Sequence, residues 1–414
     1  MDIQELLTAS KAATVSMAAA STTQKNLALE GIAKELEANV SEIIAANELD
    51  LAAGEQSGLS KALQDRLRLD AQRVKSLASA VREIISLPDP VGDSVQGRTL
   101  ANGLMIQQVR VPFGVIGCIY EARPNVTVDI AALAIKSGNC AVLRGGSAAE
   151  NTNKVLISVI QKGLIGADLP SSAVVTVDPF GRDGAVELMQ ARGLVDVLIP
   201  RGSANLIHTV VTESKVPVIE TGDGIVHIFA DASANVELAI PIIVNSKAQR
   251  PSVCNSLETL LVHEQVAAEL LPKLAKALAE SSVLVHACEQ SIALMPGSIP
   301  ATEQDWATEY LGLELSVRTV KSLDQAIAHI SKYSTKHTES ILTESIANAE
   351  RFLQEIDSAV VMVNSSTRFT DGGEFGLGAE VGISTQKLHA RGPMGLRELT
   401  STKWLVRGNG QVRS

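Results

Sequence analysis

VIGCIYEARPNVTVDIAALAIKSGNCAVLR, residues 115–144, is the stretch that decides the fold. Two short apolar runs, Val115–Tyr120 and Ala141–Arg144, flank Val128–Lys136, whose apolar residues have helical spacing, and Gly138 is typical of a helix end. The pattern predicts a strand, a helix and a second strand. Connections of this length are right-handed crossovers, so the two strands are expected to be parallel members of one sheet.

The same alternation continues along the chain. Helices are expected at Ala148–Gly163 and from Ser203, and strands near Ala173–Val177, Val195–Ile199, Val216–Ile219 and Gly224–Ala230. A second α/β stretch is predicted from Asp231 to Asn364. Before the quoted stretch, Glu5 to Ile85 has the spacing of several helices, and Asn102-Gly103 predicts a hairpin. The fold class is therefore α/β, with parallel sheets covered by helices.

Composition favours a globular protein that binds small molecules. The 414 residues are 45% hydrophobic and 20% charged, enough for large cores in two or three domains. A net charge of -10 disfavours nucleic-acid or anionic-membrane partners. No signal peptide and no apolar run of about 20 residues occurs, and the four cysteines form no CxxC pair. We therefore expect a cytoplasmic protein without a metal site, disulfides or membrane association.

A cofactor-binding loop is the first candidate site. Neither GxGxxG nor GxxxxGK[ST] follows a predicted strand. Instead, Arg144 ends a strand, Gly145-Gly146 permits close backbone approach, and Ser147 is placed to cap the next helix. A cation there suits the 2′-phosphate of NADP. A glycine turn with a solvated arginine is the commoner explanation of these residues alone.

Three further residues or segments are candidates. Gly202-Ser203 leads into a helix whose amides could hold a pyrophosphate, although such a loop taken alone is more often only an ordinary turn. Cys254 lies in the locally cationic segment KAQRPSVCNS, and nearby cations favour a nucleophilic thiolate. Glu220 ends an apolar strand, where functional side chains often lie. Taken alone, a lone cysteine is more often structural, and Glu220 equally fits a solvated loop acid.

In this order, the segments resemble the aldehyde dehydrogenase superfamily over the whole chain. PFGVIG followed by RPN resembles the approach to the superfamily's oxyanion-hole asparagine, here Asn125. GNCAVLR is similar to the segment with the ribose-binding lysine, with Arg144 in its place. By the same resemblance Cys254 is the nucleophile, Glu220 the family's glutamate, and Glu309 the carboxylate that binds the nicotinamide ribose.

Within the superfamily, YEARPNVTVD, LRGGSAA, IPRGSANLI and KAQRPSVCNSLETLLVH look most like members that reduce an acyl phosphate. The resemblance implies NADPH-dependent reduction of L-glutamyl 5-phosphate to L-glutamate 5-semialdehyde and phosphate, the second step of proline biosynthesis, through a Cys254 thioester. It implies catalytic roles for Cys254, Asn125 and Glu220. The remaining predicted contacts with the cofactor are Arg144, Gly145, Gly146, Ser147, Gly202, Ser203 and Glu309. The positive charges of Lys247, Arg250 and Arg391 make these three residues the candidates for binding the departing phosphate.

The resemblance also implies domains and partners. It predicts an NADPH-binding domain at 1–224, a catalytic domain at 225–384 and an oligomerisation segment at 385–414, with the hairpin 97–111 contributing. Both domains are expected to be Rossmann-like, and the chain to form a homodimer or homotetramer. A transient complex with a separate glutamate 5-kinase is a further expectation, because acyl phosphates hydrolyse readily.

Two other functions stay open at this point. A phosphate-independent semialdehyde dehydrogenase would use the same Cys254, with Glu220 activating water. A non-catalytic member of the fold would keep the cofactor site only, but the intact set of Asn125, Cys254 and Glu309 argues against it. Dependence on phosphate separates the first alternative from the predicted reductase.

Overall fold

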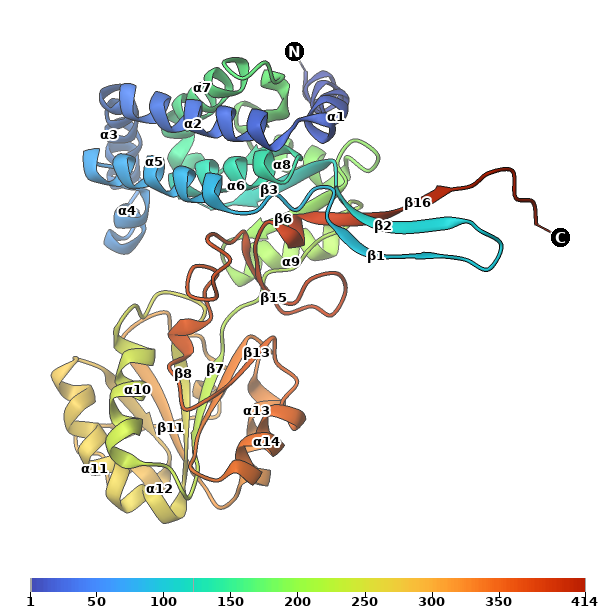
Figure 1. Cartoon of the computed structure of the whole chain (residues 1–414). Coiled ribbons are helices and arrows are strands. Elements are labelled where there is room, and N and C mark those ends of the chain that lie inside the picture. Colours follow the sequence, from blue (N-terminus) through green and yellow to red (C-terminus); the bar gives the residue numbers. More distant parts are fainter. Residues whose placement is uncertain (1, 122, 414) are drawn as a thin grey trace. The chain divides into compact units, whose positions relative to one another are not determined.

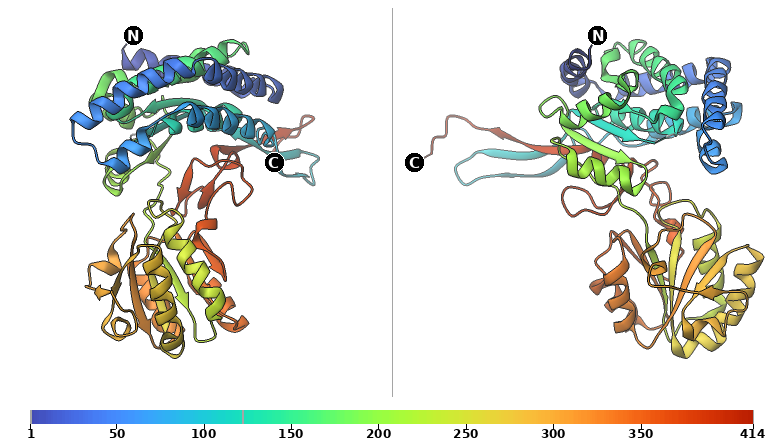
Figure 2. Two further views of the ribbon diagram at one scale, coloured as in Figure 1. Left: turned by 90° about the vertical axis from the view of Figure 1, so that its left-hand side faces the viewer. Right: turned by 180° about the vertical axis from the view of Figure 1, so that it is seen from behind.

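The chain forms two compact units in the computed structural model, which describes residues 2–121 and 123–413. The first unit contains Met1–Glu220, Gly376–Gly382 and Met394–Ser414, and the second contains Thr221–Phe375 and Ile383–Pro393. Figure 1 and Figure 2 show the elements of both units. The tail predicted as one segment, 385–414, is thus divided between the two units.

A four-stranded parallel sheet, in the order β5-β4-β3-β6, is the centre of the first unit. Its strands are β3 (Val115–Tyr120), β4 (Cys140–Arg144), β5 (Val174–Thr176) and β6 (Val197–Arg201). Every residue of β3 is buried, as expected for a strand covered on both faces. The helices of this unit are α1 (Ile3–Ala19), α2 (Thr22–Ala38), α3 (Val40–Gln56), α4 (Lys61–Leu67), α5 (Ala71–Ser86), α6 (Pro124–Lys136), α7 (Glu150–Ile165), α8 (Gly181–Gln190) and α9 (Ala204–Glu213).

The first unit also carries a three-stranded antiparallel sheet, which extends away from its helices in Figure 1. The strands β1 (Ser94–Thr99) and β2 (Met105–Pro112) form the predicted hairpin, and β16 (Thr400–Arg407) from the tail pairs with β2. Gly103 adopts a φ of 86° in the turn, a conformation that glycine favours. Trp404 on β16 is 49% exposed. Exposed strand edges of this kind usually need protection, but oligomerisation through this sheet stays a prediction.

A seven-stranded parallel sheet, in the order β10-β9-β11-β8-β7-β12-β13, is the centre of the second unit. Its strands are β7 (Val226–Ala230), β8 (Leu257–His263), β9 (Leu284–Ala287), β10 (Ile299–Pro300), β11 (Glu314–Val320), β12 (Thr338–Leu342) and β13 (Val360–Val363). Its helices are α10 (Val236–Ala248), α11 (Glu264–Glu280), α12 (Glu289–Ile292), α13 (Leu323–Tyr333) and α14 (Ile346–Glu355). The short strands β14 (Gly382–Ser384) and β15 (Gly392–Met394) pair with each other.

Both faces of the second sheet are covered by helices. On one face, Leu260 of β8 joins a buried cluster with residues of α10 and α11. On the other face its neighbour Leu261 joins a cluster with residues of α13 and α14, and Figure 1 shows the two helix layers. Successive strand residues point to opposite faces, so a strand buried on both faces must be apolar throughout.

Three details differ from the sequence predictions. The helix predicted from Val128 begins at Pro124, because proline is well suited to the first helical position. The strand predicted at Val216–Ile219 is wrong: only Val218 forms an isolated bridge, and the adjacent Pro217 has no N–H for a ladder. The sequence did not predict α8, whose two glycines weaken its helical signal.

Three candidate site residues lie at the amino-terminal ends of strands of the second sheet. Gly224 precedes β7, Cys254 precedes β8 and Glu309 precedes β11, so all three lie toward the amino-terminal ends of the strands. Ligands of open α/β sheets more commonly bind at the carboxyl ends. The candidate nucleophile therefore depends on loops that enter the strands rather than on loops that leave them. Among the described helices, none combines the length and apolarity needed to cross a membrane.

Candidate active site

Cys254 lies in the loop between α10 and β8, where its side chain is partly buried. The backbone of Gly224 packs directly against this loop. A Cβ placed on Gly224 would lie 1.5 Å from the carbonyl oxygen of Cys254, whereas real Cβ contacts are essentially never shorter than 3.0 Å. Only glycine fits this position, so the contact fixes the cysteine loop against the start of β7.

Glu309 joins this group through the same glycine. The N–H of Gly224 donates to Oε1 of Glu309 at 2.8 Å. Burial raises the pKa of Glu309; the bond from Gly224 opposes this effect, while the negative charge of Asp223 adds to it. The structure thus brings together two predicted site residues, Cys254 and Glu309, that are far apart in the sequence.

The other cysteines have different environments. Burial raises the pKa of both Cys118 and Cys140 to about 12, so neither forms a thiolate near neutral pH. Cys288, beside α12, is partly buried, and its sulfur lies 3.2 Å from the Ser291 hydroxyl. Burial acts to raise its pKa, but hydrogen bonds with Ser291 and the amide of Thr319 outweigh that effect and lower it. Sequence analysis did not single out Cys288 among the four cysteines.

The predicted phosphate ligands lie in three different settings. Arg250 is exposed, four positions before Cys254. Lys247 is fully buried, and its Nζ lies 2.6 Å from Oε2 of Glu258, which is fully buried too. Arg391 donates to Oδ1 of Asp357 at 2.8 Å. Lys247 and Arg391 therefore already have acidic partners, and phosphate binding by any of the three stays a prediction.

The buried pair predicts a large effect on stability. Lys247→Met is expected to lower the free energy of unfolding by about 3–5 kcal/mol, because it leaves Glu258 buried without its cation. Burial raises the pKa of Glu258 to about 8 even with Lys247 present, which shows how strongly the site disfavours a lone carboxylate. Urea unfolding measures the change, and Lys247→Met combined with Glu258→Leu should recover most of it.

The control is Lys273→Met, which removes an exposed lysine beside Glu237 and Glu269. Exposed ion pairs contribute little, so this variant should unfold at nearly the same urea concentration as the unmodified protein. Equal losses of unfolding free energy in Lys247→Met and Lys273→Met would show that the buried pair stabilises the fold no more than the exposed ion pairs do.

Asn125 lies in the first turn of α6, in the first unit. Its Nδ2 donates to Oδ2 of Asp129 at 3.0 Å, which orients the amide and leaves a second N–H for an oxyanion. Burial raises the pKa of Asp129 to about 6, against the opposing effects of Asn125 and Arg201. Asn125 and Cys254 belong to different units, and their cooperation in one site stays a prediction.

The loop after β4 is tightly held. Nη1 of Arg144 donates to the carbonyl of Gly145, whose own N–H donates to Oδ1 of Asp178, both at 2.7 Å. A Cβ on Gly145 would lie 2.1 Å from the side-chain nitrogen Nδ2 of Asn153, so glycine permits this close packing. Gly146 precedes a 3₁₀ turn that begins at Ser147.

The prediction that Ser147 caps the following helix is wrong. α7 begins only at Glu150, and the residue before it provides no side-chain cap. The carboxylate of Asp50, from α3, accepts from the backbone N–H groups of Asn151 and Thr152 instead, at 3.2 and 2.8 Å. A residue distant in sequence therefore satisfies the amides at this helix start.

Gly202 and Ser203 precede α9 as predicted. Ser203 is the N-cap residue but makes no side-chain cap; its hydroxyl donates to Oε1 of Glu121 at 2.6 Å. A Cβ on Gly202 would meet the Glu121 side chain at 2.7 Å. The amides of the first turn of α9 therefore have no side-chain cap, as a phosphate-binding helix start requires. Glu220 is partly buried and is the last residue of the segment Met1–Glu220 of the first unit.

Comparisons with known proteins show which family this chain belongs to. The family model "Aldehyde dehydrogenase family" matches residues 1–293. A gamma-glutamyl phosphate reductase of Leifsonia xyli subsp. xyli is 61% identical over 412 residues, covering 100% of this chain and 98% of the relative. One from Clavibacter michiganensis subsp. michiganensis is 60% identical, covering 100% and 95%. The crystal structure of the Thermotoga maritima enzyme of that name has a TM-score of 0.97, 46% identity and full coverage of both chains.

The chain belongs to the aldehyde dehydrogenase family, among its gamma-glutamyl phosphate reductases. The predicted resemblance, the α/β fold class and the assignment as an oxidoreductase are confirmed. As an aldehyde dehydrogenase family member the chain uses a nicotinamide cofactor and acts on a small-molecule substrate. The individual site residues stay predictions.

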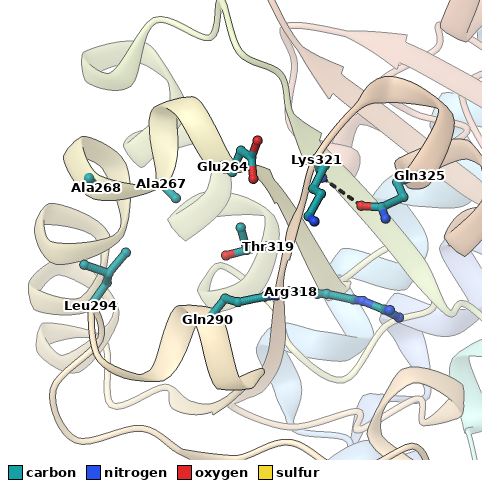
Figure 3. A pocket seen from close by; sticks show the side chains of 9 residues that line it. All are labelled: Glu264, Ala267, Ala268, Gln290, Leu294, Arg318, Thr319, Lys321 and Gln325. Carbon is teal, nitrogen blue, oxygen red and sulfur yellow. Dashed lines mark hydrogen bonds between the residues drawn. The ribbon is translucent and has the colours of Figure 1, made fainter.

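A polar cavity of about 340 Å³ lies at the carboxyl-terminal ends of the strands of the second sheet, opposite the strand ends near Cys254 (Figure 3). Glu264, Thr319 and Lys321, at or beyond the carboxyl ends of β8 and β11, contribute to its lining. No predicted site residue lines it, so it is separate from the arrangement around Cys254. Among the described residues, no group of three or more His, Cys, Asp and Glu side chains could hold a metal ion.

The second unit contains several buried histidines. The ring of His329 packs against His227, Trp306 and Tyr333, with ring centres 5.5, 5.6 and 4.6 Å away. Burial, with the nearby charges of His227 and Arg318, lowers the pKa of His329 to about 2. Burial alone lowers the pKa of His337 to about 4. Both rings therefore stay neutral at physiological pH.

This burial predicts a loss of stability in acid. An unfolded chain protonates histidine near pH 6.5, whereas folded His337 stays neutral down to about pH 4. Stability from this group is complete above pH 6.5 and is lost as the pH falls toward 4. Between pH 6.5 and 5.5 the loss is about 1 kcal/mol per such histidine. Urea unfolding at both values should show a smaller difference for His337→Gln; an unchanged difference would contradict the assignment.

Proposed function

We propose that this chain reduces L-glutamyl 5-phosphate to L-glutamate 5-semialdehyde and phosphate, using NADPH and a thioester on Cys254, as the second step of proline biosynthesis. The observation that carries the proposal is the packing of Cys254 against Gly224. The N–H of Gly224 also donates a hydrogen bond to Glu309. Two relatives that are 61% and 60% identical to this chain are named gamma-glutamyl phosphate reductase.

The chemistry starts at the cysteine. The Cys254 thiolate attacks the carbonyl carbon, a C–S bond forms, and the C–O bond to phosphate breaks with its electron pair leaving on phosphate. In this proposal the Asn125 amide and the Cys254 backbone N–H stabilise the oxyanion, a type of donor worth about 3 kcal/mol. After reduction of the thioester carbonyl, the C–S bond breaks, the thiolate is regenerated and the aldehyde is released.

The residues of the first unit fit a phosphorylated dinucleotide. Nε of Arg144 is buried without a hydrogen-bond partner in the described part of the chain, and the start of α9 has no side-chain cap. We assign Arg144, Gly145, Gly146 and Ser147 to the adenosine ribose end, Gly202 and Ser203 to the pyrophosphate, and Glu309 to the nicotinamide ribose. When bound, NADPH supplies the hydride. Reduction needs no activated water, so Glu220 has no obligatory role as a base.

The wider context is proposed on the same basis. Assembly through β1, β2 and β16 would give a homodimer or homotetramer and cover the exposed strand edges. A transient complex with glutamate 5-kinase would shorten the lifetime of the free acyl phosphate. The site would operate in the cytoplasm, where free thiols stay reduced.

The deciding experiment is the reverse reaction. Purified protein is given glutamate semialdehyde and NADP+, with and without inorganic phosphate, and NADPH is followed by absorbance. Sustained NADPH formation that requires phosphate supports the reductase. Sustained formation that is indifferent to phosphate would instead indicate the phosphate-independent dehydrogenase.

A further inference from the structure

Arg368 lies beside the cysteine loop, although its position in the sequence gives no hint of this. It belongs to a short 3₁₀ turn, Thr367–Phe369, that follows β13. Asn255, the residue after Cys254, anchors this turn: its carbonyl accepts from the Thr367 hydroxyl at 2.8 Å and its Nδ2 donates to the carbonyl of Thr370 at 2.7 Å. The turn and the cysteine loop are therefore one hydrogen-bonded structure.

The guanidinium of Arg368 spans the segment between Arg250 and Cys254. Its Nε donates to Oε1 of Gln249 at 2.8 Å, and its Nη1 donates to Oδ1 of Asn255. Gln249 comes directly before Arg250, and Asn255 directly after Cys254. These two hydrogen bonds, one at each end of the segment, hold the guanidinium beside Arg250 and Cys254.

Its positive charge is not neutralised by an ion pair. Both hydrogen-bond partners of the guanidinium are neutral amide oxygens, and among the described residues no carboxylate forms an ion pair with Arg368 or Arg250. Asp371 and Glu374 lie near, but Oδ1 of Asp371 accepts backbone N–H groups of Gly373 and Glu374. Burial and the charge of Arg250 lower the pKa of Arg368, whereas Asp371, Cys254 and Glu374 act to raise it.

We propose that Arg368, together with Arg250, binds the phosphoryl group of the acyl phosphate and stabilises it as it leaves. This inference rests on the proposed function and adds a residue to it. A guanidinium with free N–H groups matches a phosphate in charge and geometry better than a lysine does. By contrast, Arg391 already donates to Asp357, and Lys247 is fully buried against Glu258.

In the forward direction, the role of Arg368 begins when Cys254 attacks. As the C–S bond forms, the bridging oxygen takes the electron pair of the breaking C–O bond, and the phosphate gains negative charge beside two cations. In the reverse direction, inorganic phosphate must occupy the same place before its oxygen attacks the thioester and expels the thiolate. Arg368 should therefore act only in the phosphate-dependent half of the reaction.

The test uses full-length Arg368→Met and Arg368→Lys in the reverse reaction. With phosphate varied, Arg368→Met should raise the KM for phosphate by about 10- to 100-fold, and Arg368→Lys by less, because it keeps the charge but loses the fork of donors. The KM for NADP+ should not change. Arg351→Met is the matched control: this arginine pairs with Asp324 and Glu355 on the second unit's surface, and its variant should behave as unmodified protein.

A rapid-mixing measurement without phosphate separates the possible failures. Formation of the Cys254 thioester from the aldehyde releases one NADPH per active site and involves no phosphate. Arg368→Met should keep this burst and lose only the phosphate-dependent turnover that follows. Loss of the burst in both Arg368 variants, or an unchanged KM for phosphate, would overturn the assignment. If unmodified protein turns over without phosphate, the proposed function itself fails.

Discussion

Replacing Cys254 with alanine is expected to lower turnover in either direction by at least about a thousand-fold, because no thioester can form without the thiolate. The variant should fold normally, since the loop is held by the backbone contact with Gly224 and by the hydrogen bonds of Asn255. Steady-state rates and the NADPH burst without phosphate measure the effect, and both should disappear. Binding of the nicotinamide cofactor, followed by fluorescence, should persist.

Cys288→Ser is the matched control for this prediction. Like Cys254, Cys288 is partly buried. Despite this burial, hydrogen bonds lower the pKa of Cys288, so its environment permits a nucleophilic thiolate. However, it adjoins the polar cavity at the carboxyl ends of the strands, because its sulfur accepts from the N–H of Thr319, a residue that lines this cavity. Its serine variant should keep activity within about two-fold. If Cys288→Ser lost activity and Cys254→Ala kept it, the nucleophile would have been misassigned.

Gly224→Ala is expected to reduce activity by at least about 100-fold, since small displacements of reacting groups have effects of that size. A methyl group 1.5 Å from the Cys254 carbonyl oxygen cannot be accommodated, so either the cysteine loop or the start of β7 must move. The movement would also disturb the N–H that binds Glu309. The free energy of unfolding should fall by about 1–3 kcal/mol, as for other overpacked sites.

Gly312→Ala tests whether this effect is specific. Gly312 lies three residues after Glu309, and a Cβ there would meet only the Tyr310 carbonyl oxygen, at an ordinary 3.6 Å. Its activity and urea midpoint should stay close to those of unmodified protein. If Gly224→Ala were equally well tolerated, the close contact could not be what positions the cysteine.

Much of the fold was predictable because it is written in local patterns. β3 spans the predicted Val115–Tyr120, because a buried parallel strand is apolar at every position. The hairpin at Asn102-Gly103 was predicted by turn residues that permit a positive φ. The missed α8 and the mistaken strand at Val216–Ile219 lack such clear local signals, since glycines weaken the first and Pro217 interrupts the second.

The site was only partly predictable. The segment around Cys254 could be selected because its polar, cationic setting differs from the apolar strands that hold Cys118 and Cys140. Ser147 was misjudged as a helix cap because the actual cap, Asp50, comes from a distant helix. Arg368 was missed altogether, because nothing within its own segment refers to Cys254.

The sequence by itself determined the family, the order of strands and helices, and the choice of Cys254 and Glu309 as candidates, because each depends on residues close together in the chain. Only the tertiary structure decided which side chains share an environment. Folding buried Lys247 against Glu258, packed Gly224 onto Cys254, and held Arg368 beside the cysteine loop. The physical reason is that burial, close packing and charge interactions depend on distance in space, which local sequence patterns do not encode.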